Sequence, residues 1–130
     1  LSYIQSRPEV DPNRIGLVGY SLGGSLALRL DQNRNNYATL ILLSGFVDTD
    51  EDLEQLASGN TPTLILQEED EGIIPMSVAL LINDTLEAHG IEHEMVVIEG
   101  ADHRWIDQAG EDGFDAIVEF LDSYLSPSEP

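Results

Sequence analysis

The segment richest in possible chemistry spans residues 19–23, which read Gly-Tyr-Ser-Leu-Gly. A serine flanked by glycines, between an apolar run and a run with helical periodicity, is typical of a tight strand-to-helix turn. Such a turn pushes the serine hydroxyl outward, where a substrate can reach it. The segment therefore predicts Ser21 as a nucleophile. The alternative is that Ser21 only caps the helix that follows it.

Ser21 would need a base and an acid in order to act. A free hydroxyl is almost fully protonated at neutral pH, so a neighbouring imidazole must accept its proton. His103 lies in a loop after an apolar run and is the candidate base, whereas His89 and His93 are interpreted as residues of a helix end and a strand start. The acidic residues 68–71 could supply a carboxylate that holds the imidazole in the correct tautomer.

Four short apolar runs predict the strands that would position these residues. They alternate with segments of helical periodicity, a pattern that predicts a three-layer α/β/α fold with a parallel sheet covered on both faces. The ligand of such a sheet lies beyond the carboxyl ends of its strands, where Ser21, residues 68–71 and His103 all fall. The predicted strands are residues 14–18, 37–43, 63–66 and 94–98, and the predicted helices follow Ser21, begin near residue 75 and cover residues 114–125.

Residues 10–24 resemble the nucleophile region of the α/β hydrolases, in particular the dienelactone hydrolases and the carboxylesterase and acylhydrolase-like members. Serine, acid and histidine also follow one another in the chain order of that fold. Where such proteins read His-Gly-x-x-Asp-x-x-Val-Pro, residues 67–75 read Gln-Glu-Glu-Asp-Glu-Gly-Ile-Ile-Pro. Counting back from Pro75 places Glu71 at the acid position. Asp70 is the alternative acid, and a third interpretation is that the whole turn is a solvated loop.

The resemblance covers nearly all of the chain and implies the C-terminal portion of one α/β-hydrolase domain, residues 1–130, with the earlier strands absent. It implies a serine hydrolase that cleaves small carboxylic esters or thioesters through an acyl-enzyme and needs no cofactor. The backbone N–H of Leu22 would be one oxyanion donor, and Tyr20 and Trp105 could border the pocket. The short polar stretch of residues 44–61 resembles members without a cap domain.

Two other functions remain open. One is a serine peptidase related to the prolyl oligopeptidases, whose catalytic domains carry similar segments. The other is a non-catalytic hydrolase-like module that binds a ligand or a partner, suggested by the departures from the usual pattern at Gln67, Glu68 and Glu71. A metal site in the acidic turn lacks matched ligands nearby, so none is predicted.

The charge balance limits the partners of this chain. It has 25 acidic residues against five basic ones and a formal net charge of −20, so nucleic acid and anionic membranes are poor partners. Such an acidic surface is typical of proteins adapted to high salt, although an ordinary acidic protein would have a similar composition. The chain has no cysteine and no run long enough to cross a membrane, and its compartment stays open. An exposed sheet edge beside the serine could pair with a second copy.

Overall fold

A computed structural model of the 130-residue chain describes all residues except 35–36, 48, 70–71, 103, 105–109 and 128–130. Strands and helices alternate along the chain, as the apolar pattern predicts. In chain order the elements are α1 (Ser2–Gln5), β1 (Gly16–Tyr20), α2 (Leu22–Arg34), β2 (Thr39–Leu43), α3 (Asp50–Ser58), β3 (Thr63–Glu68), α4 (Met76–Ala88), β4 (His93–Ile98) and α5 (Gly110–Leu125).

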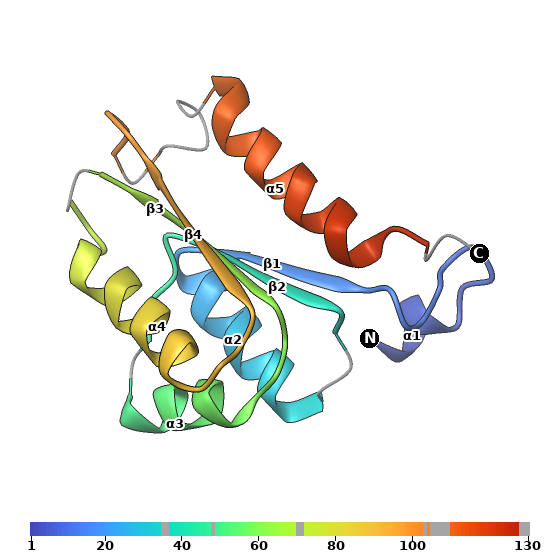
Figure 1. Cartoon of the computed structure of the whole chain (residues 1–130). Helices are drawn as coiled ribbons and strands as arrows, with labels where there is room; N and C mark the ends of the chain where they lie inside the picture. The colour runs from blue at the N-terminus through green and yellow to red at the C-terminus, as the bar shows by residue number, and fades with distance from the viewer. Residues whose placement is uncertain (35–36, 48, 70–71, 103, 105–109, 128–130) are drawn as a thin grey trace.

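The four strands form one parallel sheet in the order β1-β2-β3-β4. Figure 1 shows α5 on one face of the sheet and α2, α3 and α4 on the other face. This is the predicted three-layer α/β/α arrangement. Because all strands run in the same direction, their carboxyl ends meet at one edge, and we call it the carboxyl edge.

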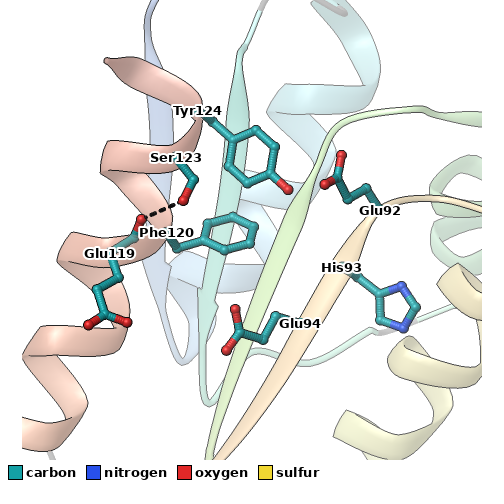
Figure 2. A pocket seen from close by; sticks show the side chains of 7 residues that line it. All are labelled: Glu92, His93, Glu94, Glu119, Phe120, Ser123 and Tyr124. Carbon is teal, nitrogen blue, oxygen red and sulfur yellow. Dashed lines mark hydrogen bonds between the residues drawn. The ribbon is translucent and has the colours of Figure 1, made fainter.

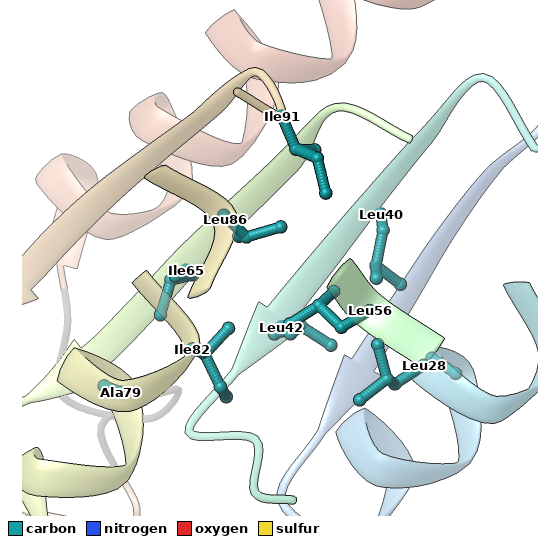
Figure 3. Packing of buried hydrophobic residues seen from close by; sticks show 10 residues of the cluster. Leu28, Leu40, Leu42, Leu56, Ile65, Ala79, Ile82, Leu86 and Ile91 are labelled. Atoms are coloured by element: carbon teal, nitrogen blue, oxygen red, sulfur yellow. The ribbon is translucent and has the colours of Figure 1, made fainter. Parts of the chain in front are cut away.

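The core lies in two layers because side chains alternate across each strand. Leu40 and Leu42 of β2 face α2, α3 and α4, whereas Ile41 and Leu43 face α5. Every residue of β2 and β3 is buried, as expected for inner strands of a parallel sheet. Figure 3 shows nine labelled residues of the first layer: Leu28, Leu40, Leu42, Leu56, Ile65, Ala79, Ile82, Leu86 and Ile91.

Strand β1 lies at the margin of the sheet. Among the described residues it pairs only with β2. Val18 is 51% exposed, although the apolar run to which it belongs predicts a strand buried on both faces. The margin at β1 therefore offers an apolar strand to a further polypeptide segment, and pairing with a second copy stays a prediction.

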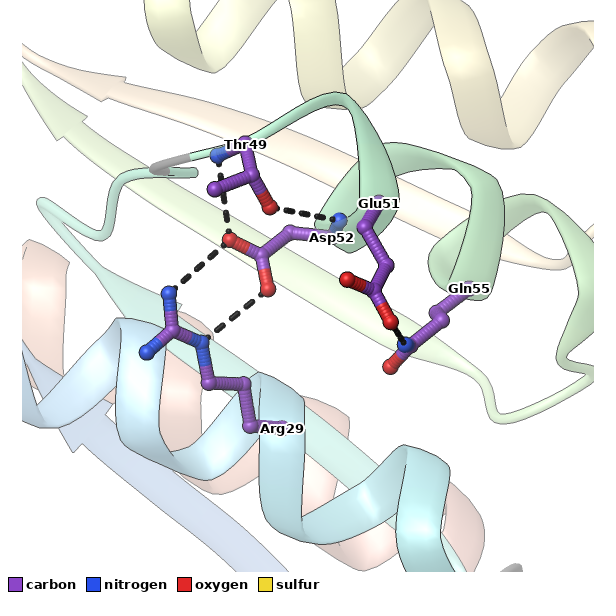
Figure 4. A network of polar contacts seen from close by, with 5 residues as sticks. All are labelled: Arg29, Thr49, Glu51, Asp52 and Gln55. Carbon is purple, nitrogen blue, oxygen red and sulfur yellow. Dashed lines mark hydrogen bonds and ion pairs between the residues drawn. The ribbon is translucent and has the colours of Figure 1, made fainter.

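Helix α3 is not apparent from the polar composition of its segment. Thr49 and Asp52 form a capping box, in which the Thr49 hydroxyl accepts from the Asp52 N–H and the Asp52 carboxylate accepts from the Thr49 N–H. Figure 4 shows that the same carboxylate receives two hydrogen bonds from Arg29 of α2, at 3.0 and 3.1 Å. The acidic first turn also suits the positive end of the helix dipole.

Strand β3 extends further than its apolar run predicts. The sequence places Glu68 in the acidic turn, but Glu68 is the last residue of β3 and pairs in register with Ile98 of β4. Pairing with β4 extends the strand by two polar residues.

Among the described residues, no helix is long and apolar enough to cross a membrane.

Candidate active site

Ser21 occupies the turn between β1 and α2. Its φ of +53° lies in the left-handed region, which a non-glycine residue rarely adopts and which is frequent at functional sites. The N–H of Ser21 donates to the carbonyl oxygen of Leu43 at 2.8 Å, and the carbonyl oxygen of Ser21 accepts from the Gly24 N–H at 2.9 Å. The predicted strand, turn and helix are all present, with the serine at the carboxyl edge.

The glycines around Ser21 differ in how much space a side chain would have at each position. A Cβ on Gly19 would lie 2.2 Å from the carbonyl oxygen of Gly23, and a Cβ on Gly24 would lie 2.8 Å from the Cα of Gly45. Both approaches are far closer than a side chain tolerates. A Cβ on Gly23 would meet nothing within 4 Å. Close backbone packing therefore requires glycine at residues 19 and 24, and the second glycine of the five-residue pattern is not required for space.

Leu22 is the first residue of α2, so its backbone N–H belongs to the first turn of the helix. The first N–H groups of a helix have no acceptor within the helix, and the helix dipole makes this end attractive to negative charge. The position suits the predicted oxyanion donor. Tyr20, the other predicted neighbour, is half-buried and packs against the core layer under α5.

Turns that follow the other strands meet Ser21 at the carboxyl edge. Ser44 follows β2, and its N–H donates to the Leu66 carbonyl oxygen at 2.8 Å. Glu69 follows β3, its N–H donates to the Ile98 carbonyl oxygen at 3.1 Å, and its carboxylate accepts from the Gly100 N–H at 2.8 Å. Each turn is thus fixed to the next strand, and the turns after β3 and β4 are joined directly.

The predicted partners of Ser21 lie outside the described residues. These are His103, Glu71, the alternative acid Asp70, and Trp105. Their convergence with Ser21 stays a prediction. The other two histidines are placed as the sequence predicts, since His89 is the C-cap of α4 and His93 is the first residue of β4.

Ser44 and Glu68 form a buried polar pair that sequence reasoning missed. The Ser44 hydroxyl donates to the Glu68 Oε2, and both residues have an exposed fraction of 0%. Ser44 also has a positive φ, +48°. The available signal was Glu68 itself, because this position is usually glycine in the family that the sequence resembles.

Gln67, which stands where that family usually has histidine, is also fully buried. Its side-chain amide nitrogen donates to the Ile74 carbonyl oxygen at 3.0 Å and fixes the segment that leads into α4. Its Oε1 has no hydrogen-bond partner among the described residues.

A cavity of about 350 Å³ lies at the edge of the sheet opposite the carboxyl edge. Figure 2 shows its lining, in which the Tyr124 hydroxyl points toward Glu92. Burial, the hydrogen bond with Glu92 and the charges of Glu92 and Glu94 together raise the pKa of Tyr124 to about 12, with burial as the largest cause. Because His93 begins β4, this cavity is remote from Ser21.

Among the described residues, no group of three or more acidic or histidine side chains could hold a metal ion.

Comparison with solved structures shows the class of fold. The chain matches an acylaminoacyl peptidase from Pyrococcus horikoshii with a TM-score of 0.87 and 15% identity, over 98% of this chain and 27% of the other. It matches a dienelactone hydrolase-like promiscuous phosphotriesterase from metagenomic libraries with a TM-score of 0.81 and 13% identity, over 96% and 58% of the two chains. The fold is therefore that of the α/β hydrolases.

The family model for the dienelactone hydrolase family matches residues 1–124, and the chain belongs to that family. A human protein described as a carboxymethylenebutenolidase homolog is 26% identical over 110 residues. A similar protein from Pongo abelii has the same identity over the same length. The match covers 84% of this chain and 44% of each relative, so the chain spans less than half the length of these curated proteins.

Proposed function

We propose that this chain provides the nucleophile of a serine hydrolase that cleaves carboxylic esters or thioesters through an acyl-enzyme. The observation that carries the proposal is Ser21 at a φ of +53°, between the end of β1 and the first turn of α2. This turn places the serine directly before the first turn of a helix. Family membership supports hydrolysis as the class of reaction.

The reaction would proceed in two halves. As the Ser21 Oγ attacks the carbonyl carbon, His103 takes the hydroxyl proton, and the carbonyl oxygen becomes negatively charged beside the Leu22 N–H. The intermediate then collapses, the bond to the leaving group breaks, and His103 gives the proton to the departing oxygen or sulfur. Water repeats the sequence on the acyl-enzyme, releases the acid and restores Ser21.

A carboxylate that follows β3 would orient His103 and stabilise the imidazolium. The resemblance assigns this role to Glu71, with Asp70 as the alternative. Tyr20 and Trp105 would border the acyl pocket. None of these steps requires a metal ion or a cofactor.

The Leu22 N–H would be one oxyanion donor, and hydrolases of this fold use two donors. Loss of one donor lowers the rate by roughly a hundredfold to a thousandfold in comparable sites.

The acylaminoacyl peptidase match supports a peptidase only through a shared fold, because the identity is 15%. Parallel assays on p-nitrophenyl esters and on acylated peptide anilides separate the two activities. Faster turnover of the esters, lost in Ser21→Ala with an unchanged unfolding midpoint, supports the proposal. Ester turnover that survives in Ser21→Ala would contradict it, and a protein inactive on both substrates that still binds a ligand would favour the non-catalytic module.

A further inference from the structure

Glu68 is a fully buried acidic residue at the last position of β3. A carboxylate removed from water is costly unless hydrogen bonds or charges compensate it, so a buried one needs a specific reason. The other five residues of β3 are uncharged. The burial of Glu68 therefore requires an explanation beyond packing.

The Glu68 side chain contacts the turn that follows the neighbouring strand. Its Oε2 accepts from the hydroxyl of Ser44, which follows the neighbouring strand β2. Ser44 is itself held in place, because its N–H donates to the Leu66 carbonyl oxygen at 2.8 Å. The hydrogen bond thus fixes the position of the Glu68 carboxyl group.

This position is next to the Ser21 turn. Tyr20 and Leu43, the last residues of β1 and β2, are register partners, and the Ser21 N–H donates to the Leu43 carbonyl oxygen at 2.8 Å. Ser44 is thus the residue beside Ser21 on the next strand, and neighbouring strands lie about 4.8 Å apart. Glu68 is therefore bonded to the residue that lies beside the Ser21 turn.

The other acidic residues described at this edge have different bonds. Glu69 is exposed, and its Oε2 accepts from the Gly100 N–H. Asp102 accepts from the Arg104 N–H at 2.8 Å and lies 3.8 Å from the Arg104 guanidinium. Among these three carboxylates, only Glu68 is fully buried and bonded across the strand ends.

We propose that Glu68, held by Ser44, is a carboxylate that orients and stabilises the imidazole base of this site. The inference rests on the proposed function, because it assumes a histidine base acting on Ser21. Glu68 is a positioning residue, since it acts through the base and not on the substrate. A carboxylate has about four lone-pair sites, so a bond from Ser44 leaves it able to accept an imidazole N–H.

The test compares four variants of the full-length protein by the rate at which a fluorophosphonate probe labels Ser21, with kcat and KM measured on a p-nitrophenyl ester. Glu68→Gln keeps the size of the side chain and an oxygen that can accept from Ser44, but it removes the charge. Glu68→Asp keeps the charge on a shorter side chain. Ser44→Ala removes the hydroxyl that holds the carboxylate. Glu69→Gln is the matched control, because Glu69 is the next residue in the chain, is exposed and bonds to the Gly100 N–H.

We expect Glu68→Gln to lower kcat and the labelling rate by roughly a hundredfold or more while KM stays nearly constant, because triads depend strongly on their acid. Glu68→Asp should recover part of this loss, Ser44→Ala should lower the rate by about tenfold, and Glu69→Gln should stay within about threefold of the parent. A purely structural role would change the unfolding midpoint and would not divide kcat from KM in this way.

Labelling of the parent protein distinguishes a failure of this inference from a failure of the proposed function. If the parent is labelled at Ser21 and Glu68→Gln is labelled equally fast, or if Glu69→Gln is equally slow, the inference is overturned and the proposed function stands. An unlabelled parent would overturn both. If Glu68→Gln does not fold, Ser44→Ala decides: a slower rate at an unchanged unfolding midpoint supports the inference, and an unchanged rate refutes it.

Discussion

The backbone N–H of Ser21 donates to the carbonyl oxygen of Leu43 at 2.8 Å, so the turn that carries the candidate nucleophile is fixed to the neighbouring strand. The same relationship is repeated along the sheet, because Ser44 donates to Leu66 and Glu69 donates to Ile98. A serine at the end of β1 and an acidic residue at the end of β3 are therefore held at set positions by the backbone. The chemistry proposed for this edge depends on that regularity.

Replacement of the glycines near Ser21 tests how tightly this turn is packed. Gly19→Ala should destabilise the protein by about 2 kcal/mol or more, because its Cβ would lie 2.2 Å from the Gly23 carbonyl oxygen. Gly23→Ala is the matched control within the same motif and should change stability by less than about 1 kcal/mol, because its Cβ meets nothing within 4 Å. Urea unfolding measures both. Equal losses for the two variants would show that the turn is packed differently.

The pair of Arg29 and Asp52 joins α2 to α3, and its loss should destabilise the protein. The side chain of Asp52 is 7% exposed and that of Arg29 is 41% exposed, so the carboxylate would lose two bonds in a mostly buried place. We expect Arg29→Gln to cost about 1–2 kcal/mol, less than for a fully buried pair because solvent screens the guanidinium.

Arg7→Gln is the comparison for Arg29→Gln. Arg7 and Glu9 pair at 2.7 Å, but both side chains are about half exposed or more, at 49% and 59%. Exposed pairs contribute about 0–1 kcal/mol. We expect Arg29→Gln to lower the free energy of unfolding more than Arg7→Gln does. The opposite ranking would contradict a stabilising contact between α2 and α3.

Helix α3 and its contact with Arg29 also show where sequence reasoning stops. The strands β2 and β3 are recognisable because their apolar runs have no other stable place than the interior. Residues 50–58 offer no such pattern, and the bond that stabilises them comes from a residue more than 20 positions away. For the Ser44 and Glu68 pair the sequence offers Glu68 as a signal but not its partner, because the pair forms only when two strands come into register. The Ser21 turn was predictable because its requirements are local.

Asp31 gives a test of the pH dependence of stability. Burial raises the pKa of the Asp31 carboxyl above its ordinary value, and a hydrogen bond from Thr61 at 3.0 Å lowers it only in part. A group with a raised pKa in the folded state contributes stability below its unfolded pKa, near 3.8, and this stability is lost as the pH rises through the folded pKa. At neutral pH the buried charge is therefore unfavourable.

Asp31→Asn should accordingly raise the thermal unfolding midpoint at pH 7, since it removes the charge and keeps an oxygen that accepts from Thr61. The gain should shrink as the pH falls toward 3, where the parent carboxyl is protonated. Asp115→Asn, at an exposed position of α5, controls for the general effect of one charge less on a chain of net charge −20. A gain no larger than that of the control would refute the effect of burial.

The net charge of −20 predicts a response to salt. Counterions screen repulsion between surface charges, with a Debye length of about 10 Å at 0.1 M and about 3 Å at 1 M. The unfolding midpoint should therefore rise between these two concentrations of NaCl. Glucose at equal osmolality is the control for excluded-solute effects, and a midpoint that stays flat in salt would remove the idea of a salt-adapted surface.

The central claim is that the Ser21 hydroxyl is a reactive nucleophile, and its most direct test is covalent labelling read by peptide mass spectrometry. The full-length protein, treated with a fluorophosphonate at pH 7–8, should carry the adduct on the peptide that contains Ser21. Ser21→Ala and heat-unfolded protein should carry none. An adduct on another residue, or no adduct on folded protein, would contradict the account.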